Sequence, residues 1–170
     1  MESTKKFRLT EEVKIYNGVE LHRIEALKDF SNVKKGDKGG WVQYESNLSQ
    51  QGDCWIYHDA IVRDNAHVSD NVHIYNGAIV FDNARLFDSA IISNHVIICG
   101  SAHIYGKARI YGCALISGNA NVYDNARIGG NAVVNDNARI GGNAVVNDNA
   151  RICGNAVVNG NLIVSIGVFN

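Results

Sequence analysis

The chain has 170 residues, 46% of them hydrophobic, and a formal net charge of −1. One domain is expected at this length, and the near-zero charge excludes the broad basic field typical of nucleic-acid binding. No run of about 18 apolar residues is present, so we expect a cytoplasmic protein without a membrane partner. The four cysteines form no C-x-x-C pair, which argues against a disulfide framework and fits a reducing compartment.

Residues 1–49 lack the regular repeat of the remaining chain and are predicted to cap one end of the domain. Lys14–Leu21 alternates apolar and polar residues around an Asn-Gly pair, which is the pattern of a β-hairpin. The open end of a repeat protein exposes unpaired strand edges, so a terminal cap is expected. We expect Phe30 and Trp41 to close the first coil.

From Ile56 to Val164 an aliphatic residue returns at every sixth position, and a small residue, usually Ala, stands two positions before it. Residues two apart on an extended chain point to the same face. Asn, Asp and Gly fill the intervening positions, and these residues tolerate left-handed backbone angles and favour turns. Each group of six is therefore predicted to form one short strand and one turn.

Short strands separated by turns cannot form a flat sheet, so three hexads are predicted to close one triangular coil of an all-β solenoid. This pattern resembles the hexapeptide-repeat family, whose fold is a left-handed parallel β-helix; about six coils are expected over residues 50–166, with a tail at 167–170. Positions eighteen apart then stack into columns, with a distance of roughly 4.8 Å between successive coils. The Ala and aliphatic columns fill the interior, which leaves function to the outer faces, the ends or the contacts between subunits.

Several pieces of the chain resemble, more closely, the YdcK-like hexapeptide-repeat proteins of bacteria and prophages: Asp29–Phe30, Gly39–Val42, Asn47–Ser49, Gly52 and Trp55, followed by the hexads. The resemblance covers nearly the whole chain and implies the β-helix. Those proteins are generally labelled acyltransferases because of their fold, so the activity that the resemblance implies is a fold-level label.

One predicted outer face carries a line of aliphatic residues. It presents Ile61, Ile79, Ile97, Leu115 and Val133 outward, with Phe81 beside them. Outward β-branched residues can simply favour strands. The functional alternative is a subunit interface, since each aliphatic side chain contributes about 1.5–3 kcal/mol on full burial. We favour a homo-oligomer, a closed trimer in the first place, which is the arrangement that the resemblance implies.

The other two faces carry aromatic and basic residues. Arg85, Phe87 and Tyr105 lie on one of them, and Arg109 and Tyr111 lie on the other. Such residues bind flat or anionic groups, including the nucleotide portion of coenzyme A. Aromatic residues in one column also stabilise neighbouring strands without any ligand.

Four histidines, His67, His73, His95 and His103, are candidates for a general base. The resemblance implies that such a base lies at the junction between two subunits, beside bound acyl-coenzyme A. The family commonly extrudes a loop to build the acceptor site, and this chain has no such loop from 56 to 163. His67 and His103 lie two coils apart, about 10 Å, and cannot share a metal ion; no metal site is predicted.

A tandem duplication lies near the end of the chain. Asn125–Asp136 recurs identically at Asn137–Asp148. Twelve residues make two sides of a three-sided coil, so Arg127, Arg139 and Arg151 should fall on three different faces. A binding surface on one face is not built in this way, and we assign candidate sites to residues 1–124.

Three functional hypotheses remain. The first is a non-catalytic, homo-oligomeric scaffold or binding protein with no evident cofactor. The second is a coenzyme-A-dependent acyltransferase with a site between subunits. The third is polymerisation through the apolar segment Leu162–Phe169, which has no capping helix and either folds over the last coil or docks against another chain.

Overall fold

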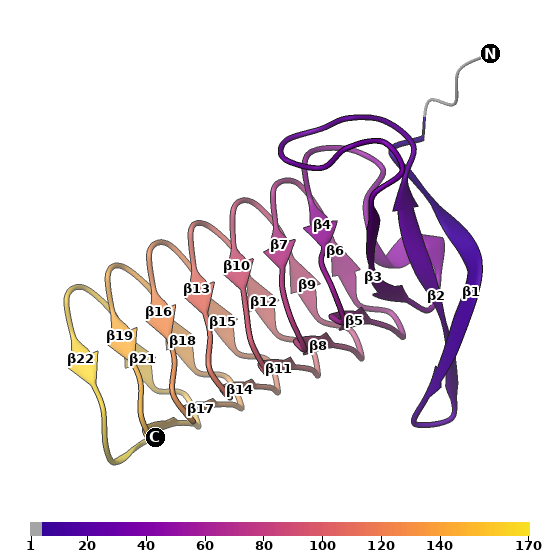
Figure 1. The fold of residues 1–170 in the computed structure, drawn as a ribbon. Coiled ribbons are helices and arrows are strands. Elements are labelled where there is room, and N and C mark those ends of the chain that lie inside the picture. Colours follow the sequence, from indigo (N-terminus) through magenta and orange to yellow (C-terminus); the bar gives the residue numbers. More distant parts are fainter. Residues whose placement is uncertain (1–4) are drawn as a thin grey trace.

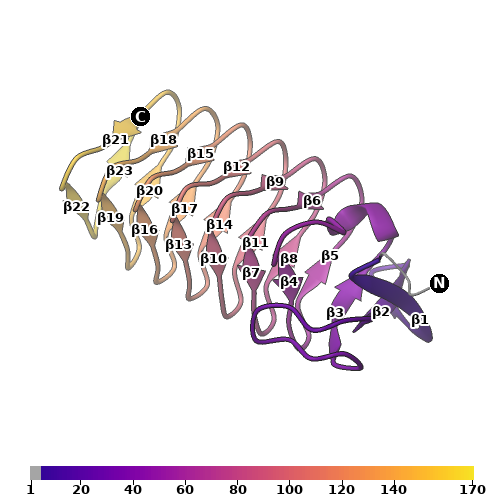
Figure 2. The ribbon, with the colours of Figure 1, turned by 90° about the horizontal axis from the view of Figure 1, so that it is seen from above.

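The structure, a computed structural model, describes residues 5–170. It is an all-β solenoid of about seven turns with an antiparallel hairpin at its N-terminal end (Figure 1). Seen from above, the turns lie in one row and the hairpin stands at the end of that row (Figure 2). Among the described residues no helix is long and apolar enough to cross a membrane.

Three sheets form the walls of the solenoid. Sheet 1, of ten strands, contains β1 (Phe7–Tyr16), β2 (Val19–Ala26), β3 (Lys38–Val42), β5 (Ile61–Val62), β8 (Ile79–Val80), β11 (Ile97–Ile98), β14 (Leu115–Ile116), β17 (Val133–Val134), β20 (Arg151–Ile152) and β23 (Val168–Phe169). Sheet 2, of seven strands, contains β4 (Trp55–Ile56), β7 (His73–Ile74), β10 (Ile91–Ile92), β13 (Arg109–Ile110), β16 (Arg127–Ile128), β19 (Val145–Val146) and β22 (Ile163–Val164). Sheet 3, of six strands, contains β6 (His67–Val68), β9 (Arg85–Leu86), β12 (His103–Ile104), β15 (Asn121–Val122), β18 (Arg139–Ile140) and β21 (Val157–Val158).

The predicted stacking of positions eighteen apart is confirmed. Ile61 pairs in parallel with Ile79, and Ile79 pairs with Ile97. The spacing differs next to the cap, where Trp41 pairs with Ile61 and Leu48 bridges to Val68, and at the C-terminal end of sheet 1, where Arg151 pairs with Val168. The parallel pairing of the solenoid thus begins at β3 and ends at β23, and these two strands extend the solenoid beyond the hexad repeats at both ends.

The interior is filled by the predicted columns, whose Ala and aliphatic residues are buried from Ile56 to Ile152. The corners are made by residues with positive φ, such as Asp64 and Asp82. Each Asp also accepts a hydrogen bond from the next turn: Asp64 Oδ2 from the Asp82 amide (3.3 Å) and Asp82 Oδ2 from the Gly100 amide (2.9 Å). The hexad therefore places Asp or Gly at these corners because the backbone is left-handed there and because a carboxylate can cap the amide of the following turn.

The cap covers the open end and part of the outer face of sheet 1. β1 and β2 extend sheet 1 with antiparallel pairing, and Phe7 and Ile24 join the interior core. Phe30 packs against the interior core and edge-on against Trp55, with 5.3 Å between ring centroids. Trp41 forms a separate small core on the outer side of sheet 1. The expectation that Trp41 closes the first coil was therefore wrong, because its side chain covers a wall, whereas Phe30 does pack against the interior core.

Candidate functional site

The aliphatic column lies on the outer face of sheet 1, as predicted, but its first member is not available. Ile61 is 3% exposed because Trp41 and Leu21 pack over it. Ile79 is half-buried against the same cluster, whereas Ile97 is 38% exposed. Three residues of the column remain open to a second chain: Ile97, which is exposed, and Leu115 and Val133, which follow it and are half-buried. The assignment of Ile61 to an interface is corrected accordingly, since its own hairpin already occupies that position.

Unpaired donors lie beside this column. The Arg63 guanidinium covers the Phe81 ring at 4.4 Å, and its Nη1 donates to Asp64 Oδ2 at 2.6 Å. Within residues 5–170, Arg63 Nε, Arg23 Nε and Trp41 Nε1 are buried without a hydrogen-bond partner. A buried donor without an acceptor costs about 1–3 kcal/mol. These donors lie within the chain's own packing, so what the open part of the column offers to a second chain is apolar area.

A groove on sheet 3 contains His67 and Arg85. It has a volume of about 230 Å³, and its walls include Tyr44, Ser46 and Asn65. His67 Nδ1 lies 2.7 Å from the Ser46 carbonyl oxygen. Because a carbonyl oxygen can only accept, Nδ1 carries the proton and Nε2 of the neutral ring keeps a free lone pair.

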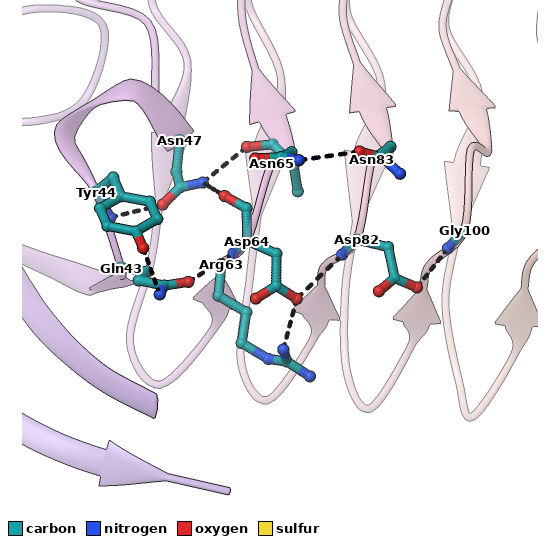
Figure 3. A network of polar contacts seen from close by, with 10 residues as sticks. Gln43, Tyr44, Asn47, Arg63, Asp64, Asn65, Asp82, Asn83 and Gly100 are labelled. Carbon is teal, nitrogen blue, oxygen red and sulfur yellow. Dashed lines mark hydrogen bonds and ion pairs between the residues drawn. The ribbon is translucent and has the colours of Figure 1, made fainter. Parts of the chain in front are cut away.

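The segment that supplies this carbonyl is a 3₁₀ turn, η1 (Glu45–Asn47), held by the network in Figure 3. Asn47 is buried; its Oδ1 accepts from the Tyr44 amide (2.7 Å), and its Nδ2 donates to the carbonyls of Asp64 (3.0 Å) and Ala66 (2.9 Å). Every polar atom of the Asn47 side chain is thus bonded. The network fixes η1 against the first turns and so fixes the acceptor that orients His67.

His73 lies on sheet 2 in a cluster of tyrosines. Tyr57 and Tyr75 stack on each other with 4.4 Å between ring centroids, and the His73 ring lies nearly parallel beside this pair, 5.7 Å from Tyr57 and 6.1 Å from Tyr75. His73 Nδ1 is 3.0 Å from Tyr57 Oη, which donates to Asn32 Oδ1 at 2.8 Å. Burial lowers the pKa of His73 and raises the pKa of Tyr57 well above its ordinary value. Both rings are therefore neutral at neutral pH and act as packed side chains.

The remaining two histidines lie apart from these groups. His103 follows Arg85 in the outward column of sheet 3, so that Arg85 separates it from His67. His95 is exposed at a corner, where its ring lies over Gly77. The four candidates therefore do not form one site, and only His67 combines a fixed ring orientation with a groove. The described residues contain no group of three or more His, Cys, Asp or Glu that could hold a metal ion.

The predicted ligand-binding aromatics have much of their ring surface covered within the chain. Phe87 and Tyr123 stack on the two sides of Tyr105, at 5.0 Å and 5.4 Å between centroids. Tyr111 lies on sheet 2 with Arg109, and its ring rests on Gly129. These contacts support the explanation in which aromatic columns stabilise neighbouring strands. Arg85 is exposed and remains the charged group beside His67.

The three arginines of the duplicated block lie on three different walls, as predicted. Arg127 lies on sheet 2, Arg139 on sheet 3 and Arg151 on sheet 1. Ser46 was missed at the sequence level, because the group that matters is a backbone carbonyl and any residue supplies one. The role of Asn47 was not predicted either: this residue was used only for the resemblance to YdcK-like proteins, and no repeat or motif marks it as buried.

Comparison with known proteins agrees with this architecture. A family model described as the YdcK β-solenoid repeat matches residues 150–165. A curated protein of Escherichia coli (strain K12), named uncharacterized acetyltransferase YdcK, is 39% identical over 61 residues. This match covers 31% of the present chain and 19% of that protein, so the chain spans about a fifth of the relative's length. The predicted resemblance to YdcK-like repeat proteins is confirmed.

Proposed function

We propose that the protein is a homo-oligomeric β-solenoid scaffold whose subunits associate through the outer face of sheet 1. The observation that carries this proposal is the open column Ile97, Leu115 and Val133, which continues the buried cluster around Ile61. An apolar line that begins as a packed core and then runs into solvent is typical of a contact surface. A closed three-fold assembly would cover the column in every subunit and leave no free copy of it.

The residue types beside the column support the same face. The Arg63 guanidinium covers the Phe81 ring next to the column, and aromatic residues and arginine are the types enriched at subunit contacts. The hairpin tip packs next to Ile79, so it would form one rim of the interface.

Sedimentation velocity tests this proposal. We expect the wild-type protein to sediment as a trimer and the double variant Ile97→Asp, Leu115→Asp to sediment as a monomer with an unchanged circular dichroism spectrum. Ile91→Asp is the matched control, because Ile91 occupies the equivalent outward position on sheet 2. A wild-type monomer, or an assembly that both aspartates leave intact, contradicts the proposal.

A second candidate function is acyl transfer from acyl-coenzyme A, with His67 as the general base. The fixed Nδ1–H···O=C contact with Ser46 leaves Nε2 ready to accept a proton, and the Arg85 guanidinium on the next rung suits a phosphate group. The Escherichia coli relative is named an uncharacterized acetyltransferase, which favours the same chemistry.

Calorimetric titration with acetyl-coenzyme A tests this second function. Binding that is lost in Arg85→Ala and retained in Arg109→Ala, the equivalent arginine position on sheet 2, supports a site in the sheet 3 groove. His67→Gln should then abolish turnover while binding persists. Absence of heat at millimolar ligand removes acyl transfer and leaves the scaffold proposal standing, because the two experiments address different faces.

A further inference from the structure

The residue that precedes β1 is a lysine buried at the capped end of the solenoid. Lys6 is 1% exposed, and only Asn47 accompanies it as a buried polar residue in the described part of the chain. Its Nζ donates to the carbonyl oxygens of Cys54 (2.9 Å), Gln51 (3.2 Å) and Gly52 (3.2 Å). The strand itself is held where the Gln50 side-chain oxygen accepts from the Lys6 and Phe7 amides (2.8 and 3.2 Å).

The carbonyl contacts explain why a cation is tolerated there. The first turn has no preceding turn to donate to its carbonyls, and an ammonium group satisfies three of them at once. They do not explain the fourth contact, which joins Lys6 Nζ to Cys54 Sγ at 3.1 Å. Cys54 is fully buried, and its sulfur is otherwise surrounded by the carbonyl oxygens of Ser49, Gln51 and Val68 at 3.6–3.8 Å.

An amine and a thiol at this separation are a reactive pair once the sulfur is oxidised. A cysteine sulfenic acid condenses with a neighbouring nitrogen to give a sulfenamide, and a thiol reductant reverses that reaction. Burial lowers the pKa of Lys6, which favours the neutral, nucleophilic amine relative to an exposed lysine. Burial also raises the pKa of the Cys54 thiol, so its oxidation is slow and depends on local opening of the strand.

We propose that Lys6 and Cys54 form a reversible covalent cross-link when the protein meets a peroxide. In the first step the Cys54 thiol and hydrogen peroxide give a sulfenic acid and one water. In the second step the Lys6 amine, after losing the ammonium proton to solvent, attacks Sγ; an N–S bond forms, the S–O bond breaks, and the oxygen leaves as a second water. Overall, thiol, amine and one peroxide give the sulfenamide and two waters, with sulfur oxidised and peroxide reduced.

The other three cysteines are internal controls for this chemistry. Cys113 is exposed, Cys153 Sγ contacts Asn170 Oδ1 at 2.6 Å, and the electrostatic neighbour of Cys99 is Asp82. Among the hydrogen bonds of residues 5–170, a lysine amine contacts the sulfur of Cys54 alone. Oxidation of Cys99, Cys113 or Cys153 should therefore add oxygen, whereas oxidation of Cys54 should remove two hydrogens and add none.

The link would fasten the first strand to the first turn. Residues 6 and 54 are far apart in the chain, and closing that loop restricts the unfolded ensemble as a disulfide does. A rise in Tm of roughly 6–12 °C is expected for a chain of this size. The cross-link therefore acts as an oxidation-dependent clamp on the cap.

The experiment uses the full chain carrying Cys99→Ser, Cys113→Ser and Cys153→Ser, treated with hydrogen peroxide at mildly alkaline pH. We expect the intact mass to fall by two hydrogen atoms, a peptide joining Lys6 to Cys54, the higher Tm, and recovery of the original mass with dithiothreitol. Lys6→Met in the same background should gain oxygen instead. If Lys6→Met does not fold, peptide mapping of the wild-type chain decides: a Cys54 that stays reduced, or that gains oxygen with Lys6 unmodified, overturns the proposal.

Discussion

The first turns and the last turns of the solenoid share one backbone plan but differ in what covers their walls. Near the N-terminus Trp55 lies under Phe30, Ile61 lies under Trp41, and His67 is fixed by a backbone carbonyl of η1. Beyond Asn125 the outward side chains are repeated Arg, Val and Asn. Regular stacking thus lengthens the molecule, whereas the most buried outward side chains lie where an irregular segment packs against a wall.

The length of the duplicated block also indicates that the last turns extend the solenoid without building a surface on one wall. A repeat of eighteen residues would copy one wall onto itself, but twelve residues shift each copy to a different sheet. Interior positions are unaffected, because both lengths are multiples of six. The duplication therefore preserved the core and scattered the outward residues, as expected of structural extension.

The largest expected difference between the two regions concerns the outward column of sheet 2. Trp55→Ala should reduce the free energy of unfolding by about 3–5 kcal/mol, because Trp55 is packed under the cap. Ile163→Ala, in the same column but 72% exposed at the far end, should change it by less than about 0.5 kcal/mol. Urea denaturation measures both. Equal effects would mean that the cap does not protect this wall.

Two asparagine substitutions, one in each region, should give the next largest difference in the free energy of unfolding. Asn47→Ala leaves the Tyr44 amide and two carbonyls without partners and should cost roughly 2–4 kcal/mol. Asn137→Ala removes one member of an exposed amide ladder and should cost less than about 0.5 kcal/mol. Thermal unfolding of the two variants gives the comparison, and a larger loss for Asn137 would reverse it.

One prediction tests whether the last turns are uniformly tolerant. A Cβ at Gly141 would collide with ring atoms of Tyr123 and lie 2.8 Å from its hydroxyl oxygen. Gly141→Ala should therefore destabilise the protein by about 1–3 kcal/mol, although it lies in the duplicated block. In a Tyr123→Ser background the same change should cost much less, and a double-mutant cycle measures that coupling. Additive effects would show that the ring and the glycine do not interact.

The smallest effect is a pH dependence confined to the capped end. The pKa of His73 is lowered in the folded state, so the unfolded chain binds the proton more readily. As pH falls below the unfolded value of about 6.5, stability should decline until the lower folded pKa is passed. His73→Gln should flatten this part of the stability profile. Identical profiles for wild type and His73→Gln would contradict the assignment.

The repeating part of the fold was predictable because one residue type at one spacing determines it. The six-residue period led directly to the eighteen-residue register, the three walls and the placement of Ile97 and Arg139 on different faces. The turn positions followed from the backbone preferences of Asp and Gly.

The cap and the candidate site were not predictable to the same degree. Residues 1–49 contain no repeat, so no sequence pattern could predict which residues Phe30 and Trp41 contact. Ile61 looked as exposed as Ile79 because periodicity describes a wall and says nothing of a segment folded over it. The orientation of His67 depends on a carbonyl, which carries no side-chain signature.

The most direct test of the difference between the two regions is to delete one whole turn from the repetitive end and measure the molar mass by sedimentation equilibrium. Removing residues 143–160 takes out eighteen positions, keeps Ile97, Leu115 and Val133 on sheet 1, and leaves the cap untouched. The scaffold account predicts a folded protein with the same number of subunits as the wild type. Dissociation of this shortened chain would contradict it, because the duplicated turns would then carry the contacts assigned to the capped half.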